Sequence, residues 1–120
     1  MIHVDVGGKN FPLKKEEVRD AAADYLRSKR QGSRSAEVLI VSAKKMASLN
    51  QKFKKKAGAT DVLSFPLEPI PGEQSPLIGT IVICGDIIKS RSTRAGRDFK
   101  DELGFVLRHG LDHLLGIHHH

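Results

Sequence analysis

The sequence lacks paired cysteines and long apolar segments. Cys84 is the only cysteine, which excludes an internal disulfide and favours a reducing compartment. The longest apolar runs, VLIV at 38–41 and IGTIVIC at 78–84, are far shorter than the roughly 20 residues that span a bilayer. The N-terminal residues do not combine a basic start with an apolar stretch, so we expect no secretory signal. Together these absences predict a cytoplasmic protein without a membrane partner.

Acidic residues are scarcer than basic ones. The chain has 14 aspartates and glutamates against 20 lysines and arginines, which gives a formal net charge of +6 and a pI of about 9.7. This excess suits a polyanionic partner, because basic side chains that neutralise phosphates release counterions. Charge alone does not identify nucleic acid as that partner, since many small basic proteins bind no polyanion.

Internal repeats, low-complexity segments and long linkers are also absent, so we expect one domain with one core. Alternation and β-branched residues predict strands over 2–6, 36–41, 60–66 and 78–85. Helical periodicity and capping residues predict helices over 13–30, from a cap at Ser42 to about residue 53, over 86–95, and over 99–115 between Asp98 and Gly116. The order β-α-β-α-β-β-α-α predicts an α/β (α+β) fold, with a central mixed sheet of four or more strands packed with helices.

The C-terminal segment HGLDHLLGIHHH, residues 109–120, contains five of the six histidines. His109 and His113 are four residues apart and share a helix face, with Cβ atoms roughly 5–6 Å apart, so both imidazoles can reach one metal ion. Gly116 then ends the helix, and His119 can return toward the same point. The pattern H-x-x-x-H-x-x-G-x-x-H has the ligand spacing of the metzincin signature, which predicts a zinc site.

Two features of this segment leave alternatives open. Gly110 stands where those proteases carry the glutamate that acts as general base, which argues against a peptidase. Residues 118–120 are a run of three histidines that a purification tag would also supply. The spacing alone does not distinguish a third ligand at His119 from such a tag.

A second segment, LNQKFKKKAGATDVLSFPLE at 49–68, resembles, together with the histidine motif, the YbeY family of single-domain zinc-dependent endoribonucleases, which act in ribosomal RNA maturation. The resemblance covers about residues 36–119. The matching residues are Leu49, Asn50, Phe53, Thr60 to Pro66, Gly79, Ile81 to Ile83, His109, Gly110, His113, Leu114, Gly116 and His119.

This resemblance implies one zinc ion held by His109, His113 and His119, on a zincin-like helix beneath a cleft. It also implies single-stranded RNA as the substrate, a role in ribosomal RNA processing and ribosome quality control, and partnership with the small ribosomal subunit and its assembly factors. We therefore expect residues 1–120 to form a single YbeY-like metallohydrolase domain. Family members continue well past the third histidine, which leaves open whether this chain is truncated.

The sequence departs from the family pattern at several positions. Lys54 replaces a functionally important arginine, and it keeps the charge but loses the bidentate fork. Five further departures are Ala57, Ala59, Thr80, Asp112 and Ile117, and His118 replaces the family's aspartate. We expect these changes to affect activity more than fold.

The predicted chemistry is metal-assisted hydrolysis of a phosphodiester. Lys54 would clamp the scissile phosphate and stabilise its growing charge. The neighbouring lysines would bind flanking phosphates, unless they form only a solvated basic loop; they are Lys52, Lys55 and Lys56. Asp61 and Ser64 would line the cleft, or would only make hydrogen bonds at the end of a strand. The competing interpretations are a non-catalytic relative that binds RNA or the ribosome, and a metallopeptidase-like hydrolase with the same three-histidine geometry.

Overall fold

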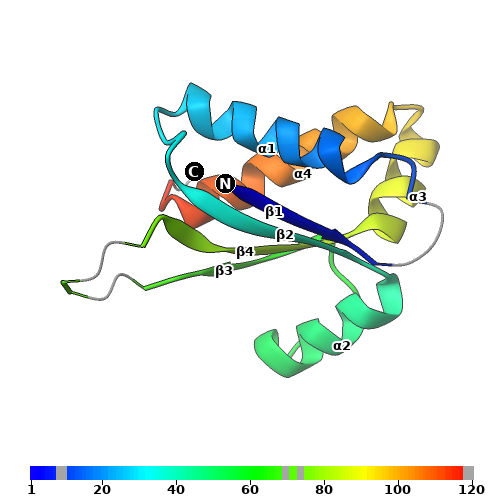
Figure 1. Ribbon diagram of the computed structural model, residues 1–120. Helices are drawn as coiled ribbons and strands as arrows, with labels where there is room; N and C mark the ends of the chain where they lie inside the picture. The colour runs from blue at the N-terminus through cyan, green and yellow to red at the C-terminus, as the bar shows by residue number, and fades with distance from the viewer. Residues whose placement is uncertain (8–10, 69–70, 73–74, 118–120) are drawn as a thin grey trace.

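The computed structural model describes residues 1–7, 11–68, 71–72 and 75–117 (Figure 1). The predicted order of elements is confirmed, with boundaries shifted by two residues or fewer. The elements are β1 (Ile2–Val6), α1 (Lys15–Ser28), β2 (Ser35–Val41), α2 (Ala43–Lys54), β3 (Val62–Pro66), β4 (Leu77–Cys84), α3 (Gly85–Ala95) and α4 (Phe99–Leu114).

The four strands form one mixed sheet in the order β1-β2-β4-β3, as the α/β prediction required. β1, β2 and β4 are parallel, whereas β3 runs antiparallel to β4, with Val62 opposite Ile83 and Pro66 opposite Gly79. Within the described residues, β3 is hydrogen-bonded to β4 alone. β3 is therefore an edge strand, and its outer side is available to line a site.

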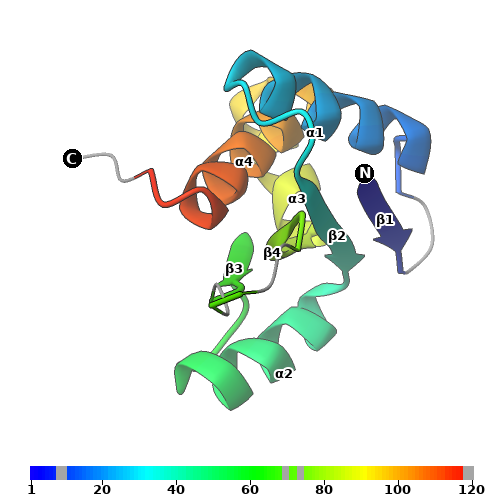
Figure 2. The ribbon, with the colours of Figure 1, turned by 60° about the vertical axis from the view of Figure 1, so that its left-hand side comes forward.

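Helices cover the two faces of the sheet unequally (Figures 1 and 2). α1 and α4 lie side by side on one face, with α3 packed against α4, while α2 lies alone on the opposite face. The larger core fills the first face, and a smaller cluster of Met46, Leu63, Val82 and Cys84 lies under α2. Cys84 is fully buried, as expected for a small core residue. None of the helices in the described ranges is long and apolar enough to cross a membrane.

Two glycines set how closely α4 approaches the sheet. A Cβ at Gly110 would lie 2.9 Å from Ile81 Cγ2 of β4, so the helix backbone packs closely against the Ile81 side chain. A Cβ at Gly79 would lie 2.4 Å from the Phe65 carbonyl oxygen and 2.8 Å from Leu114 Cδ2, and Gly79 also has φ +147°. A side chain at either position would require its neighbours to shift, so both glycines allow α4, β3 and β4 to pack closely.

The ends of α4 follow the predicted capping residues. Asp98 Oδ1 accepts a hydrogen bond from the Lys100 N–H at 2.8 Å. At the other end Gly116 has φ +77°, and its N–H donates to the His113 carbonyl oxygen at 3.2 Å. The Ile117 N–H donates to the Asp112 carbonyl oxygen at 2.8 Å. This pair of bonds is a Schellman motif, which stops the helix and turns the chain immediately after the histidine pair.

Candidate active site

A cleft of about 450 Å³ opens beside the edge strand β3. Its volume lies within the range of small-ligand sites. One wall comes from α4, another from β3, and the last residue of α2 closes one end. The lining residues are Lys54, Asp61, Val62, Leu63, Ser64, Phe105, His109 and His113. The cleft therefore brings together five of the residues that the sequence singled out, from three separate elements.

His109 and His113 occupy the α4 wall as an adjacent pair. Both are exposed, their ring centroids are 4.7 Å apart, and the ring planes are tilted by 57°. This is the i, i+4 arrangement that the spacing predicted, and two imidazoles so placed fit two positions of a tetrahedral zinc site. The predicted third ligand, His119, lies outside the described residues. Within those residues no three histidine, cysteine or acidic side chains gather as a metal-binding group.

Gly110, next to the first histidine, faces the core rather than the cleft. Its position against Ile81 leaves no space for a Cβ, and still less for a glutamate. A general base of the metzincin kind therefore has no place at this position of the helix. This packing gives a physical reason for the glycine, and it counts against a peptidase.

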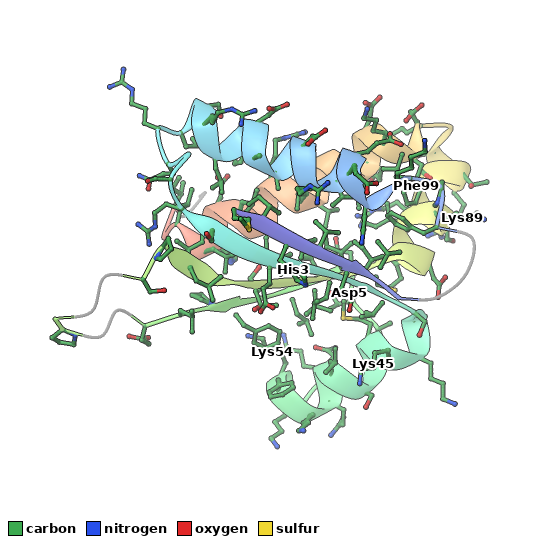
Figure 3. All side chains as sticks on the ribbon, in the orientation of Figure 1. His3, Asp5, Lys45, Lys54, Lys89 and Phe99 are labelled. Carbon is green, nitrogen blue, oxygen red and sulfur yellow. The ribbon has the colours of Figure 1, made fainter. Side chains whose placement is uncertain are left out.

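Lys54 is separated from the other lysines of its run. Its Nζ lies 5.7 Å from the centroid of the Phe65 ring on β3, and Figure 3 shows its side chain in the space between the end of α2 and the sheet. Lys52, Lys55 and Lys56 are exposed, and none of them lines the cleft. Lys54 is thus the lysine of this run that can reach a phosphate beside the histidines, and the contribution of the others stays a prediction.

The loop after α2 is held by Asn50, a residue whose role sequence reasoning did not assign. Asn50 is buried, and its Nδ2 donates to the Gly58 carbonyl oxygen at 3.0 Å. Its own carbonyl oxygen accepts from the Lys55 N–H, where the backbone is left-handed with φ +56°. These bonds turn the chain from Lys54 back toward β3. In the sequence, a polar residue among the apolar positions of α2 was the signal that could have indicated this role for Asn50.

Asp61 lines the cleft and is also paired with a residue of α3. Its Oδ2 accepts from Arg91 Nη2 of α3 at 3.2 Å. Arg91 Nε donates in turn to Glu102 at 2.8 Å, and Glu102, which is buried on α4, also accepts from Arg97 at 3.3 Å. This chain of charges connects the residue before β3 with α3 and α4. The sequence did not predict it, although an acidic residue in the apolar stripe of α4 was a hint.

On the other flank of α4 lies a second hollow of about 360 Å³, lined by Tyr25, Phe105, Arg108, His109 and Asp112. Tyr25 donates its hydroxyl hydrogen to Asp112 Oδ1 at 2.6 Å. The pKa of Tyr25 is raised to about 12, mainly by burial and also by the hydrogen bond and the charge of Asp112, while the charge of Arg108 opposes the shift. Asp112, which departs from the family's leucine, is therefore a buried carboxylate with a tyrosine partner.

Comparisons with known proteins agree with this geometry. A family model described as endoribonuclease YbeY matches residues 4–120. Proteins named endoribonuclease YbeY from Anaeromyxobacter sp. (strain Fw109-5) and Sulfurovum sp. (strain NBC37-1) are 39% and 40% identical to the chain over 102 and 90 residues. These alignments cover 85% and 72% of this chain, and 53% and 61% of the relatives. The chain thus spans little more than half the length of these relatives.

Two further matches cover nearly the whole chain. A protein of the same name from Legionella pneumophila (strain Corby) is 32% identical over 123 residues, which cover 98% of this chain and 77% of the relative. The solution structure of a Thermotoga maritima protein superposes with a TM-score of 0.65 and 29% identity, and it covers all of this chain and 75% of that one. The whole α/β arrangement is therefore shared with a solved structure.

Proposed function

Because this chain belongs to the endoribonuclease YbeY family, we propose that it is an endoribonuclease that cleaves single-stranded RNA by metal-assisted phosphodiester hydrolysis. The observation that carries the proposal is the cleft where His109 and His113 of α4 meet Lys54 across the edge strand. The proposal extends to the processing of ribosomal RNA and quality control of ribosomes in the cytoplasm, with the small ribosomal subunit and its assembly factors as partners.

The histidines would hold one zinc ion, with His119 as the third ligand beside His109 and His113. Their adjacent rings, their exposure to the cleft and the turn at Gly116 all suit this role. When bound, zinc supplies a Lewis acid that polarises a phosphoryl oxygen and acidifies water. The protein contributes the wall that carries the histidines, because Gly110 lets α4 pack closely against the Ile81 side chain of β4.

Lys54 would stabilise the negative charge that grows on the scissile phosphate. Its ammonium group lies over the Phe65 ring, a contact that restricts its position and leaves its charge available to the cleft. A single ammonium holds a phosphate as a point charge and not through a bidentate fork, so the angle of attack is less constrained than with arginine. Lys52, Lys55 and Lys56 would contribute only to the general attraction of RNA toward this end of α2.

Asp61 and Ser64 would shape the β3 wall. Asp61 is paired with Arg91, so part of its charge is already neutralised and repels a phosphate less. Ser64 can offer a hydroxyl donor to a phosphate or sugar oxygen. Both roles concern binding and orientation of the RNA.

A non-catalytic role in binding RNA is the second candidate, and the observation that favours it is Lys54 in place of the family's arginine. Cleavage and binding are separable in one experiment. The chain, made without added histidines, is incubated with a fluorescent single-stranded RNA, with zinc or with chelator. The endoribonuclease proposal expects cleavage that requires zinc, whereas the binding proposal expects retention of intact RNA under both conditions.

Substitutions of single histidines test the metal ligands. His113→Ala should abolish zinc binding and RNA cleavage together. His3→Ala is the matched control, because His3 is an exposed histidine on β1, the opposite edge strand of the sheet (Figure 3). Among the last three residues, only His119→Ala should reduce zinc content. Cleavage that survives His113→Ala or chelation would rule out the zinc mechanism.

A further inference from the structure

Phe105 is exposed in a chain that buries most of its large apolar side chains. Its exposed fraction is 64%, compared with 52% for Phe53 and Leu67, and of the described residues only Met1 is a more exposed large hydrophobic. One exposed apolar residue needs no explanation by itself. The location of Phe105 does need an explanation, because Phe105 lines both the histidine cleft and the second hollow on the other flank of α4.

Phe105 and His109 form the ridge between the two hollows. They are four residues apart on α4, so their side chains are neighbours on one face of the helix. His113 continues on the cleft side, while Arg108 and Asp112 continue on the side of the second hollow. A flexible polymer that enters the cleft beside the histidines would therefore cross α4 over the ridge that Phe105 and His109 form.

The second hollow has the chemistry of a nucleotide site. Its exposed charged residue is Arg108. The Arg108 guanidinium lies back along the helix over Gly104, where a Cβ would be only 2.9 Å from Arg108 Nη1. Asp112 also lines the hollow, but it is buried and accepts the hydroxyl hydrogen of Tyr25, so its carboxylate is partly satisfied within the fold. The hollow therefore offers an aromatic ring on one side and a guanidinium on another. Stacking on aromatic rings and phosphate contacts from arginine are how proteins hold single strands.

We propose that the second hollow is a nucleotide subsite, in which Phe105 stacks on a base adjacent to the scissile phosphate and Arg108 contacts the next phosphate. This inference rests on the proposed function, because it takes single-stranded RNA as the ligand in the histidine cleft. It adds a binding track across α4. Stacking on Phe105 tolerates any base, since every base has a π-face. Phe105 thus positions the strand without dictating its sequence.

The first test compares variants at position 105 in RNA binding, measured by fluorescence anisotropy with chelator, and in cleavage with zinc. Phe105→Ala should weaken binding and raise KM about 5- to 150-fold, the range expected for loss of one stacked base. Phe105→Tyr should restore most of the affinity, and Phe105→Leu should not. Leu67→Ala is the matched control, because it removes an equally apolar, exposed side chain outside both hollows.

The second test uses RNA with one abasic nucleotide, moved stepwise past the cleavage site. At one position the abasic RNA should bind the unaltered chain as weakly as Phe105→Ala binds normal RNA, and combining the two changes should cause no further loss. Arg108→Ala should weaken binding and reduce its salt dependence. Zinc content should be unchanged in Phe105→Ala, which excludes a disturbed histidine site.

The possible failures are distinguishable. If the unaltered chain cleaves RNA and Phe105→Ala or Phe105→Leu does so with the same KM, the subsite is wrong and the proposed function stands. Additive effects of Phe105→Ala and the abasic nucleotide at every position also overturn the subsite. An unaltered chain that neither binds nor cleaves single-stranded RNA overturns the proposed function, and this inference falls with it.

Discussion

The hydrogen bond between Tyr25 and Asp112 should stabilise the fold by an amount that can be measured directly. The tyrosine comes from α1 and the aspartate from α4, 87 residues apart in sequence, and the donor–acceptor distance is 2.6 Å. Asp112 is 5% exposed, so water is a poor substitute for the lost donor. A hydrogen bond to a charged group contributes about 1.5–3 kcal/mol. Tyr25→Phe should therefore lower the free energy of unfolding by about that amount.

A double-mutant cycle isolates this pair from the other contacts of each residue. Asp112→Leu introduces the family's residue and removes the buried charge. The loss of unfolding free energy in this single variant includes every interaction that Asp112 makes. In the Asp112→Leu background, Tyr25→Phe should cost little, because no buried carboxylate is left without its tyrosine donor. Urea unfolding of the four proteins should give a coupling energy of about 1.5–3 kcal/mol. A coupling energy near zero would refute the reasoning.

The pKa of Tyr25 provides an independent measurement. Tyr25 is the only tyrosine and the chain has no tryptophan, so tyrosinate absorbance reports this one side chain. The absorbance should titrate with a pKa of about 12 in the folded protein, against about 10 when unfolded. In Asp112→Leu the pKa should fall but stay above 10, because burial is the largest cause of the shift. An ordinary pKa in the unaltered chain would contradict the structure.

The sign of the effect on stability follows from the raised pKa. The folded state holds the phenol proton more tightly than the unfolded state does, so this stabilisation is complete below about pH 10. It is lost as pH rises from about 10 through about 12, because the unfolded chain releases the proton first. The unaltered chain should therefore lose more stability over this alkaline range than Tyr25→Phe, which has no phenol to titrate. Equal losses would show that the tyrosine proton is not linked to folding.

Four further predictions concern the site and its supports. Lys54→Arg restores a bidentate fork and should raise the rate of RNA cleavage, whereas Lys54→Ala should lower it about 100-fold or more, as loss of one transition-state donor does; single-turnover kinetics measure both. Gly79→Ala should unfold the chain or lower its melting temperature strongly, because the new Cβ would meet the Phe65 carbonyl oxygen at 2.4 Å; a stable, unchanged protein would contradict this packing. Lys55→Gly should raise the free energy of unfolding by up to about 1 kcal/mol, since it relieves a left-handed residue, and its effect on RNA affinity separately measures the Lys55 charge. Glu102→Gln should lower the unfolding free energy by about 1–3 kcal/mol, because Arg91 and Arg97 lose a charged acceptor, whereas a variant with unchanged stability in urea unfolding would show that the buried charge contributes nothing.

Much of the fold could be predicted because its signals are local. Strand alternation and the caps at Ser42, Asp98 and Gly116 each act within a few residues, and each has the predicted structure. The i, i+4 histidine pair is local in the same sense, since helix geometry alone brings the two rings together. The spacing of residues in the sequence could not predict which residues form the wall of the cleft opposite the histidines. Lys54 reaches the cleft only because β3 is added antiparallel at the edge of the sheet, a pairing between separate segments.

The residues that sequence reasoning missed are those whose partners are distant in the chain. Asp112 is the clearest case, because a leucine-to-aspartate change in the histidine motif suggests loss of activity when that motif is considered alone. The structure gives it a partner in Tyr25, which lies on α1, outside the segment that carried the family resemblance. The change is therefore compensated in packing, and it leaves His113 on the cleft side of α4. Lys54 has no such compensation among the residues that line its cleft, where it is the only basic side chain other than the histidines. Of the two departures from the family, Lys54 is therefore the one expected to change the rate of cleavage, and Asp112 the one expected to change stability.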